Sequence, residues 1–136
     1  MQSAGVSATE HDPDSALAIM RTGLIDAVQV IYNIFDQTPE ARMLPLAQEM
    51  NIGILARVPL DEGALSGTMT ETTTFPAGDF RAYYFRGAER KRQVVEHVDA
   101  LRRDLGEGAS LPDTALRFCL SHPAVSSVIQ IGRAHV

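Results

Sequence analysis

Short runs of apolar residues alternate along the chain with longer amphipathic stretches. The apolar runs have the length of strands, and turn-forming residues lie at their ends. They cover residues 2–8, 27–31, 54–58 and 126–129. The stretches between them have apolar residues three or four positions apart, which is the spacing of one helix face. The pattern therefore predicts four strands that alternate with helices.

The predicted helices begin at capping sequences. Asp-Pro-Asp at 12–14 and Thr-Pro-Glu at 38–40 each place a capping residue before a proline that fits a first helical turn. Pro45 lies inside the second helix, so we expect a kink there. Apolar residues at 94, 98, 101 and 105 mark a third helix. A fourth begins after Ser110, where Asp113 completes a near capping box.

Strands that are apolar on both faces and alternate with helices predict a parallel sheet covered by helices. An open doubly wound sheet would place a glycine-rich phosphate turn after its first strand, and no G-x-G-x-x-G occurs in the chain. A (β/α)8 barrel fits better, because its ligand groups come from the carboxyl ends of the strands. Ser7, Gln29, Asn33 and Arg57 occupy such positions.

The composition narrows the class of protein. With 136 residues, of which 45% are hydrophobic, the chain is long enough for one compact core and too short for two. A net charge of −5 and a single lysine, Lys91, argue against a nucleic-acid partner. No apolar run is long enough to span a membrane, and no charged and apolar leader opens the chain, so we expect a cytoplasmic protein. Cys119 is interpreted as a reduced core thiol, and the four histidines show no metal-ligand spacing.

The segment from Asp61 to Arg86 is longer than most connections and rich in Thr and Gly, which is typical of a functional loop. It follows the strand at 54–58 directly. A turn of this kind exposes peptide N–H groups that can hold an anion. The segment is therefore a candidate edge of a ligand site.

Four sequence motifs together resemble the aldo-keto reductase family. They are GVS at 5–7, VQVIYN at 28–33, GILARVPLDEGALSG at 53–67 and ALRFCLSHPAVSSVI at 115–129. In order and spacing they are similar to the last four strands of that family. The resemblance implies an incomplete (β/α)8 TIM barrel, with strands 5 to 8 and their helices in residues 1–129.

The resemblance implies an NADPH-dependent reduction of aldehydes or ketones, with a small carbonyl compound as substrate. The family's catalytic Asp, Tyr, Lys and His lie on the first four strands, so we expect them upstream of Met1 and assign no catalytic residue here. Tyr32, Tyr83 and Tyr84 match structural and loop tyrosines of the family. The alternative function is a non-catalytic, cofactor-sensing partner of another protein. The oligomeric state is not predicted.

The same resemblance implies where the nicotinamide end of the cofactor would bind. It places Gln29 and the Ser7 hydroxyl against the carboxamide; a buried amide needs a partner, and pairing with neighbouring backbone is the alternative for Gln29. Ala8 departs from the asparagine usual in the family, which weakens the case for Ser7. Arg57 stands where relatives have an aromatic residue that stacks on the nicotinamide. The alternative for Arg57 is an ion pair with Asp61 or Glu62.

The resemblance also implies a pyrophosphate site on the backbone amides of the turn that follows, with its carboxylates pointing outward. The residues of this turn are Val58, Pro59, Leu60, Asp61 and Glu62. Gly63 and Gly67 would relieve crowding next to the ligand. Arg81 matches a loop arginine that can reach the cofactor, with a solvated residue as the alternative. Thr68 replaces a lysine common in relatives.

We expect neither end of this sequence to be a native terminus. Met1 falls just inside the turn that precedes the family's fifth strand, as an internal methionine would. The resemblance stops after Ile129, and residues 131–136, Ile-Gly-Arg-Ala-His-Val, are similar to a translated sequencing adapter. In the adapter, the bases AG precede this sequence. A proline codon begins with C, so its first base followed by AG gives CAG, a codon for glutamine, which would account for Gln130. We therefore expect residues 130–136 to be a non-native tail.

Overall fold

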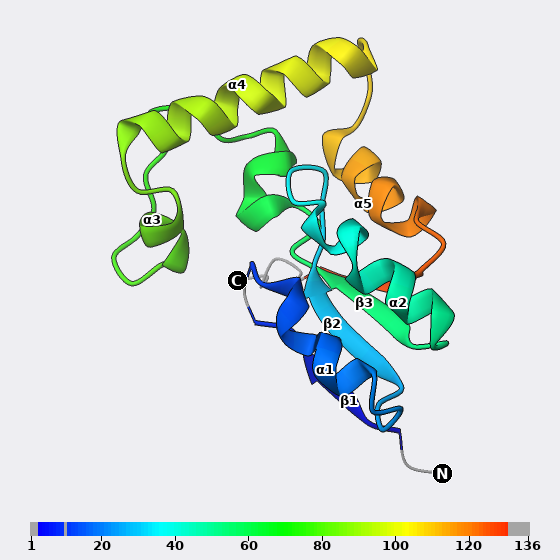
Figure 1. The fold of residues 1–136 in the computed structure, drawn as a ribbon. Helices are drawn as coiled ribbons and strands as arrows, with labels where there is room; N and C mark the ends of the chain where they lie inside the picture. The colour runs from blue at the N-terminus through cyan, green and yellow to red at the C-terminus, as the bar shows by residue number, and fades with distance from the viewer. Residues whose placement is uncertain (1–2, 10, 131–136) are drawn as a thin grey trace. The chain divides into compact units, whose positions relative to one another are not determined.

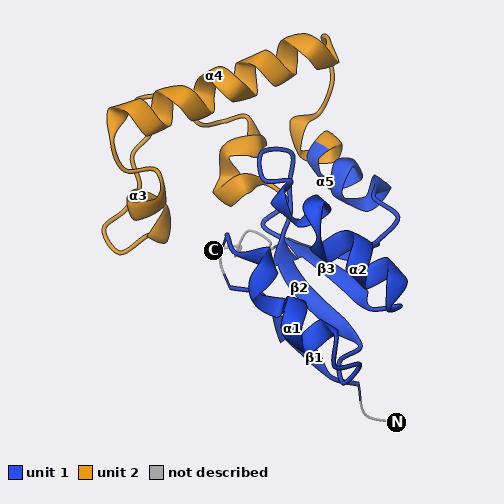
Figure 2. Cartoon of the chain, viewed as in Figure 1, with its two compact units in different colours: residues 1–59, 115–136 blue, residues 60–114 orange. Residues whose placement is uncertain are grey.

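The computed structural model describes residues 3–9 and 11–130. The described chain divides into two compact units, which are coloured separately in Figure 2. Unit 1 comprises Met1–Pro59 and Ala115–Val136, and unit 2 comprises Leu60–Thr114. Each unit has its own cluster of buried hydrophobic side chains. The predicted single core is therefore wrong: the inserted segment is long enough, and has enough aromatic residues, to bury a cluster of its own.

The core of unit 1 is a four-stranded parallel sheet (Figure 1). Its strands are β1 (Gly5–Ser7), β2 (Ala27–Ile31), β3 (Gly53–Arg57) and β4 (Val125–Ile129), and they lie in sequence order. All four predicted strands are confirmed, with shifted ends. In register, Ser7 pairs with Gln29, Gln29 with Leu55, and Ile31 with Arg57. The carboxyl ends of the strands therefore meet at one edge, as the barrel prediction requires.

Short helices connect the strands of unit 1. They are η1 (Pro13–Ala16), α1 (Leu17–Met20), η2 (Thr38–Ala41) and α2 (Met43–Glu49). The Asp12 side chain makes no cap hydrogen bond, contrary to prediction. The predicted kink at Pro45 is also wrong, because a new helix begins at Met43 and places Pro45 in its first turn, where a missing N–H breaks no helical bond.

The helix α5 (Leu111–Ser121) begins as predicted. The backbone N–H of Asp113 donates to the Ser110 hydroxyl at 3.3 Å, which confirms the cap at this end. Cys119, on this helix, is fully buried, and its thiol donates to the backbone carbonyl of Tyr32 at 3.2 Å. The prediction of a core thiol is confirmed.

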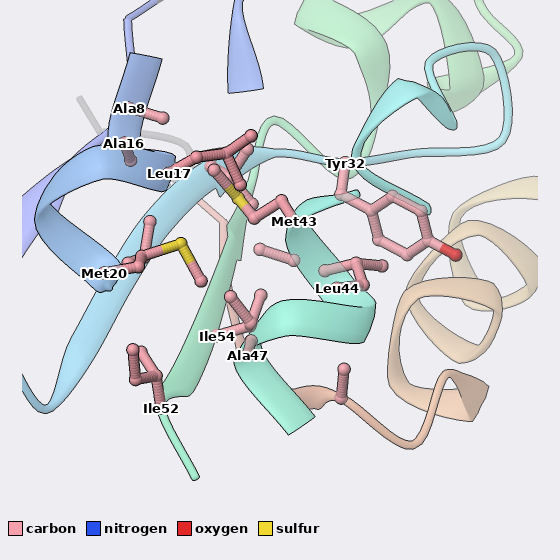
Figure 3. Close-up of a cluster of buried hydrophobic side chains, with 14 of the residues drawn as sticks. Ala8, Ala16, Leu17, Met20, Tyr32, Met43, Leu44, Ala47, Ile52 and Ile54 are labelled. Atoms are coloured by element: carbon pink, nitrogen blue, oxygen red, sulfur yellow. The ribbon is translucent and has the colours of Figure 1, made fainter. Parts of the chain in front are cut away.

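One face of the sheet packs against these helices. Val28, Val30, Ile54 and Ala56 alternate inward along β2 and β3 and join the buried cluster that Figure 3 shows in close-up. Met20, Met43, Leu44 and Ala47 from α1 and α2 complete it. The alternate residues, which include Ser7, Gln29 and Arg57, belong to the other face and lie outside this cluster. The prediction that helices cover the sheet is therefore confirmed for only one face of the described sheet.

Unit 2 contains η3 (Asp61–Ser66), α3 (Phe80–Tyr84) and α4 (Ala88–Leu105). The long loop predicted at 61–86 therefore includes two short helices. Ala64, Phe85 and Val94 form the buried centre of the unit, and the rings of Phe75 and Phe85 stack with centroids 5.7 Å apart. None of the helices in the described residues is both long enough and apolar enough to cross a membrane.

Candidate functional site

The uncovered face of the sheet in unit 1 holds a shallow hollow. Its volume is ≈ 240 Å³, and it is lined by Gly5, Val6, Ser7, Ala27, Gln29 and Leu55. Ser7 and Gln29 are direct partners on adjacent strands, so the register brings these two predicted site residues together. Gly5 and Ala27, which also line it, have little or no side chain to fill it. The hollow can take a small polar group against an amide and a hydroxyl.

Gln29 is the most informative residue of this face. Its side chain is half-buried and lines the hollow. Within residues 3–9 and 11–130, no protein group is a hydrogen-bond partner of its amide. The alternative that neighbouring backbone satisfies the amide is therefore not found in the described chain. The side chain has a donor and an acceptor available for a ligand.

Ser7 is more exposed than Gln29. Its hydroxyl donates to the backbone carbonyl of Ala8 at 3.4 Å, a long and weak contact. The residue lies on β1, at the end of the sheet order. The hydroxyl can therefore reorient toward a ligand at little cost.

Arg57 ends β3 with a half-buried side chain. Its Nε is buried and has no hydrogen-bond partner among the described residues. No carboxylate in the described part of unit 1 forms an ion pair with it. An unpaired buried donor is costly, so this guanidinium needs a further partner. Stacking on a ligand and pairing with Asp61 or Glu62 both stay predictions.

The chain turns sharply after β3, in a segment we call the phosphate turn, Val58–Gly63. Val58, Asp61 and Glu62 have positive φ angles of 58°, 46° and 52°. These angles are unfavourable for residues with a side chain, and most of all for a β-branched one. Leu60, with φ −99° and ψ 15°, precedes Asp61, and a right-handed residue followed by a left-handed one is the arrangement found in anion-binding nests. The N–H of Gly63 donates to the Leu60 carbonyl at 3.0 Å, so this amide is already occupied by the protein.

Asn33 holds the beginning of the phosphate turn. Its side chain is fully buried, and its Nδ2 donates to the backbone carbonyl of Val58 at 3.0 Å. Its Oδ1 accepts from the backbone N–H groups of Phe35 and Asp36, both at 2.9 Å. Asn33 was singled out for its place at a strand end. The structure gives it a supporting position in which its amide is occupied by the protein.

The two glycines have different protein surroundings. A Cβ added to Gly63 would meet no protein atom within 4 Å, and its φ of 101° by itself favours glycine there. Relief of crowding next to a ligand stays a prediction. A Cβ added to Gly67 would lie 2.6 Å from Nη2 of Arg102 and 2.9 Å from Cδ1 of Leu111. The crowding at Gly67 therefore comes from protein atoms of unit 2.

The two carboxylates of the turn do not both point outward as predicted. Asp61 is only 6% exposed, and its Oδ1 accepts a hydrogen bond from the Tyr84 hydroxyl at 2.8 Å. Burial, and then the Asp61 charge, raise the pKa of Tyr84, so the hydroxyl keeps its proton. Glu62 is half-buried. Pro59 is buried and Leu60 half-buried, which leaves their backbone as the part able to contact a ligand.

Arg81 lies in α3 and not in an irregular loop. Its Nε and Nη2 donate to the Asp79 carboxylate, at 2.6 Å for Nη2, and its guanidinium lies 4.9 Å from the centroid of the Phe75 ring. The hydrogen bonds from the Arg81 side chain and backbone hold the pKa of Asp79 at about 2, below its usual 3.8. The side chain is 44% exposed, so both a cofactor contact and the alternative of a solvated residue stay predictions.

The other reactive side chains are structural. The Tyr32 hydroxyl donates to Oε1 of Glu40 at 2.6 Å, and burial together with this bond raises its pKa. Tyr83 is 62% exposed and packs under Arg86. Burial raises the pKa of Cys119 to about 11, so the thiol is protonated at neutral pH. In the described ranges no three metal-ligating side chains cluster.

Two functional contacts were not predicted from the sequence, those of Asn33 with Val58 and of Tyr84 with Asp61. Each joins residues more than 20 positions apart. Periodicity identifies the strand ends but carries no information on such pairs. The only local signal was the presence of Asn33 and Asp61 within four residues after the ends of β2 and β3.

Comparisons with known proteins agree on one family. The model of the "Aldo/keto reductase family" matches residues 2–134. The chain is 31% identical over 103 residues to the "Aldo-keto reductase YhdN" of Bacillus subtilis, covering 73% of this chain and 31% of that protein. It is 32% identical over 65 residues to the "NADH-specific methylglyoxal reductase" of Escherichia coli, covering 48% and 20%. The chain thus spans less than a third of the length of these two relatives.

Solved structures give the same result. The chain superposes on the glycerol dehydrogenase AKR11B4 from Gluconobacter oxydans with a TM-score of 0.74 and 26% identity. This match covers 93% of the chain and 38% of that structure. The four parallel strands therefore correspond to part of an aldo-keto reductase barrel.

Proposed function

Because the chain belongs to the aldo/keto reductase family, we propose that it is the cofactor-binding part, strands 5 to 8 of the barrel, of an NADPH-dependent carbonyl reductase. The observation that carries the proposal is the Gln29 amide, which lines a hollow on the sheet and has no partner among the described residues. An amide side chain complements the carboxamide of a nicotinamide, since each offers one acceptor and a donor pair.

The residues present fit a nicotinamide cofactor in two ways. Gln29 and Ser7 offer an amide and a hydroxyl on adjacent strands, and Arg57 offers a guanidinium plane with a buried, unpaired Nε. The phosphate turn offers backbone amides in a conformation that suits an anion. Its proposed ligands for the pyrophosphate are the amides of Val58, Leu60, Asp61 and Glu62, with Pro59 fixing the chain direction. The Gly63 amide already donates to the Leu60 carbonyl at 3.0 Å.

In the proposed mechanism, bound NADPH supplies a hydride to the carbonyl carbon of a small aldehyde or ketone. Gln29 and Ser7 would hold the nicotinamide by hydrogen bonds to its carboxamide and so orient it. Arg57 would stack on the ring and exclude water from it. Arg81 is paired with Asp79 within unit 2, and its guanidinium would contact the cofactor only by exchanging that carboxylate for a phosphate oxygen. The residues that protonate the forming alkoxide belong to the first four strands, outside this chain.

The activity is tested on the complete gene product that carries this chain. NADPH consumption is followed by absorbance with a panel of small aldehydes and ketones, and NADH is run in parallel. We expect turnover with NADPH that saturates in both cofactor and carbonyl compound. Saturable NADPH binding without turnover of any carbonyl compound would instead indicate a cofactor sensor.

A further inference from the structure

Asp61 is a carboxylate placed where an isolated charge would be unfavourable. It is 6% exposed and opens η3 with a φ of 46°. A buried carboxylate is stable only when it is paired or hydrogen-bonded. The hydroxyl of Tyr84, 23 positions later in the chain, donates to its Oδ1 at 2.8 Å. The two residues belong to the same unit, so this contact ties α3 to η3.

Tyr84 is held firmly on α3. Its ring meets that of Phe85 edge-on with centroids 4.8 Å apart, and that of Phe80 at 5.8 Å. Arg90 lies over the ring at 5.7 Å. Because the ring is fixed on these sides, the hydroxyl is a donor of fixed position and not a mobile surface group.

The backbone near Asp61 needs such support. Asp61 and Glu62 have consecutive left-handed conformations, and Gly63 continues them with φ 101°. Residues with a Cβ enter this region at an energetic cost and stay there only when the surrounding structure holds them. Relaxation of Asp61 to a negative φ would redirect the N–H groups of Asp61 and Glu62. The backbone of Asp61 can relax only if its side chain moves as well. The hydrogen bond from Tyr84 holds that side chain in place and so opposes the relaxation.

We propose that Tyr84 is a positioning residue, which acts through the Asp61 carboxylate to hold the amides of residues 60–62 in the conformation that receives the cofactor pyrophosphate. This inference rests on the proposed function. Tyr84 makes no contact with the cofactor in this scheme, and its hydroxyl neither donates nor accepts a proton in the reaction. Its effect is on cofactor affinity and not on the rate of the chemical step.

The test compares Tyr84→Phe with Tyr83→Phe in the complete gene product. Both changes remove one hydroxyl from neighbouring residues of α3, but Tyr83 is 62% exposed. For Tyr84→Phe we expect the NADPH dissociation constant to rise about tenfold, because the variant loses one hydrogen bond to a charged group. We expect kcat at saturating NADPH to stay within about twofold of the wild type. Tyr83→Phe should leave both values unchanged.

Two further measurements separate positioning from general stability. In the absence of cofactor, hydrogen exchange of a peptide covering residues 60–66 should speed up in Tyr84→Phe and not in Tyr83→Phe. The double variant Tyr84→Phe/Asp61→Ala should bind NADPH no more weakly than Asp61→Ala alone, because Tyr84 acts through Asp61.

The outcomes distinguish the inference from the proposed function. If the wild type binds NADPH and Tyr84→Phe matches Tyr83→Phe in affinity and exchange, the inference is overturned and the proposed function stands. Additive losses in the double variant would also overturn it. If the wild type binds no nicotinamide cofactor, both are overturned.

Discussion

Replacement of Asn33 by alanine should destabilise the protein more than the small volume of the removed side-chain atoms suggests. The side chain is fully buried and makes three hydrogen bonds of 2.9–3.0 Å, one to the Val58 carbonyl and two from backbone N–H groups. Each buried group left without a partner costs about 1–3 kcal/mol. A water that enters the vacated space can recover part of this loss. We therefore expect a decrease of about 2–4 kcal/mol in the free energy of unfolding.

The assay is urea unfolding of the complete gene product, followed by circular dichroism. Gln37→Ala is the matched control, because Gln37 is exposed and makes one hydrogen bond, to the Ile34 carbonyl at 2.8 Å. The control should lose less than about 1 kcal/mol. Asn33→Asp should also destabilise, since it replaces the donor to Val58 by a carboxylate oxygen. Equal stability of Asn33→Ala and the control would refute the view that Asn33 holds the phosphate turn.

Three other predictions follow from single observations. Cys119 should react with a thiol reagent at pH 8 only after unfolding, because burial raises its pKa to about 11; rapid labelling of the native protein would contradict this. Because Arg81 lowers the pKa of Asp79 to about 2, the stabilisation from their pair should be complete above pH 4 and lost as the pH falls toward 2. An NMR titration of Asp79 checks this, and a midpoint near 4 would show that the pair is absent in solution. The 136-residue chain alone should aggregate, because its open sheet presents edge strands and an uncovered face; a cooperative monomeric melt would refute this.

The strands could be predicted because apolar runs and turn residues are local signals, whereas their order in the sheet was implied only by the resemblance to a barrel family. Gln29 shows the strength of such reasoning: it was predicted at a ligand position of a strand, and it lines the hollow on the sheet. The uncovered face itself was not predicted. The helix ends were less predictable, as Pro45 shows, since a proline fits a first turn as well as a kink. The cap at Ser110 was predicted correctly because both of its partners lie within four residues.

The features of the candidate site that were not predicted depend on contacts between residues far apart in the chain. The burial of Asp61 could not be predicted, because its partner Tyr84 lies in a segment whose sequence resembled an irregular loop. Arg81 was expected in a loop for the same reason, and its pairing with Asp79 accompanies the start of the helix α3. The expected tail at 130–136 lies outside the described residues except for Gln130. The cytoplasmic location and NADPH as the cofactor stay predictions.

The most direct test of the central claim is the affinity of Gln29→Ala for NADPH, measured by cofactor fluorescence in the complete gene product. The matched control is Gln48→Ala, which removes an exposed amide from α2. We predict that Gln29→Ala weakens NADPH binding by about 1–3 kcal/mol, the cost of leaving the carboxamide without its partner, with a smaller change in stability. Gln48→Ala should bind as the wild type does. Equal dissociation constants for all three proteins would contradict the assignment of this sheet face to the nicotinamide.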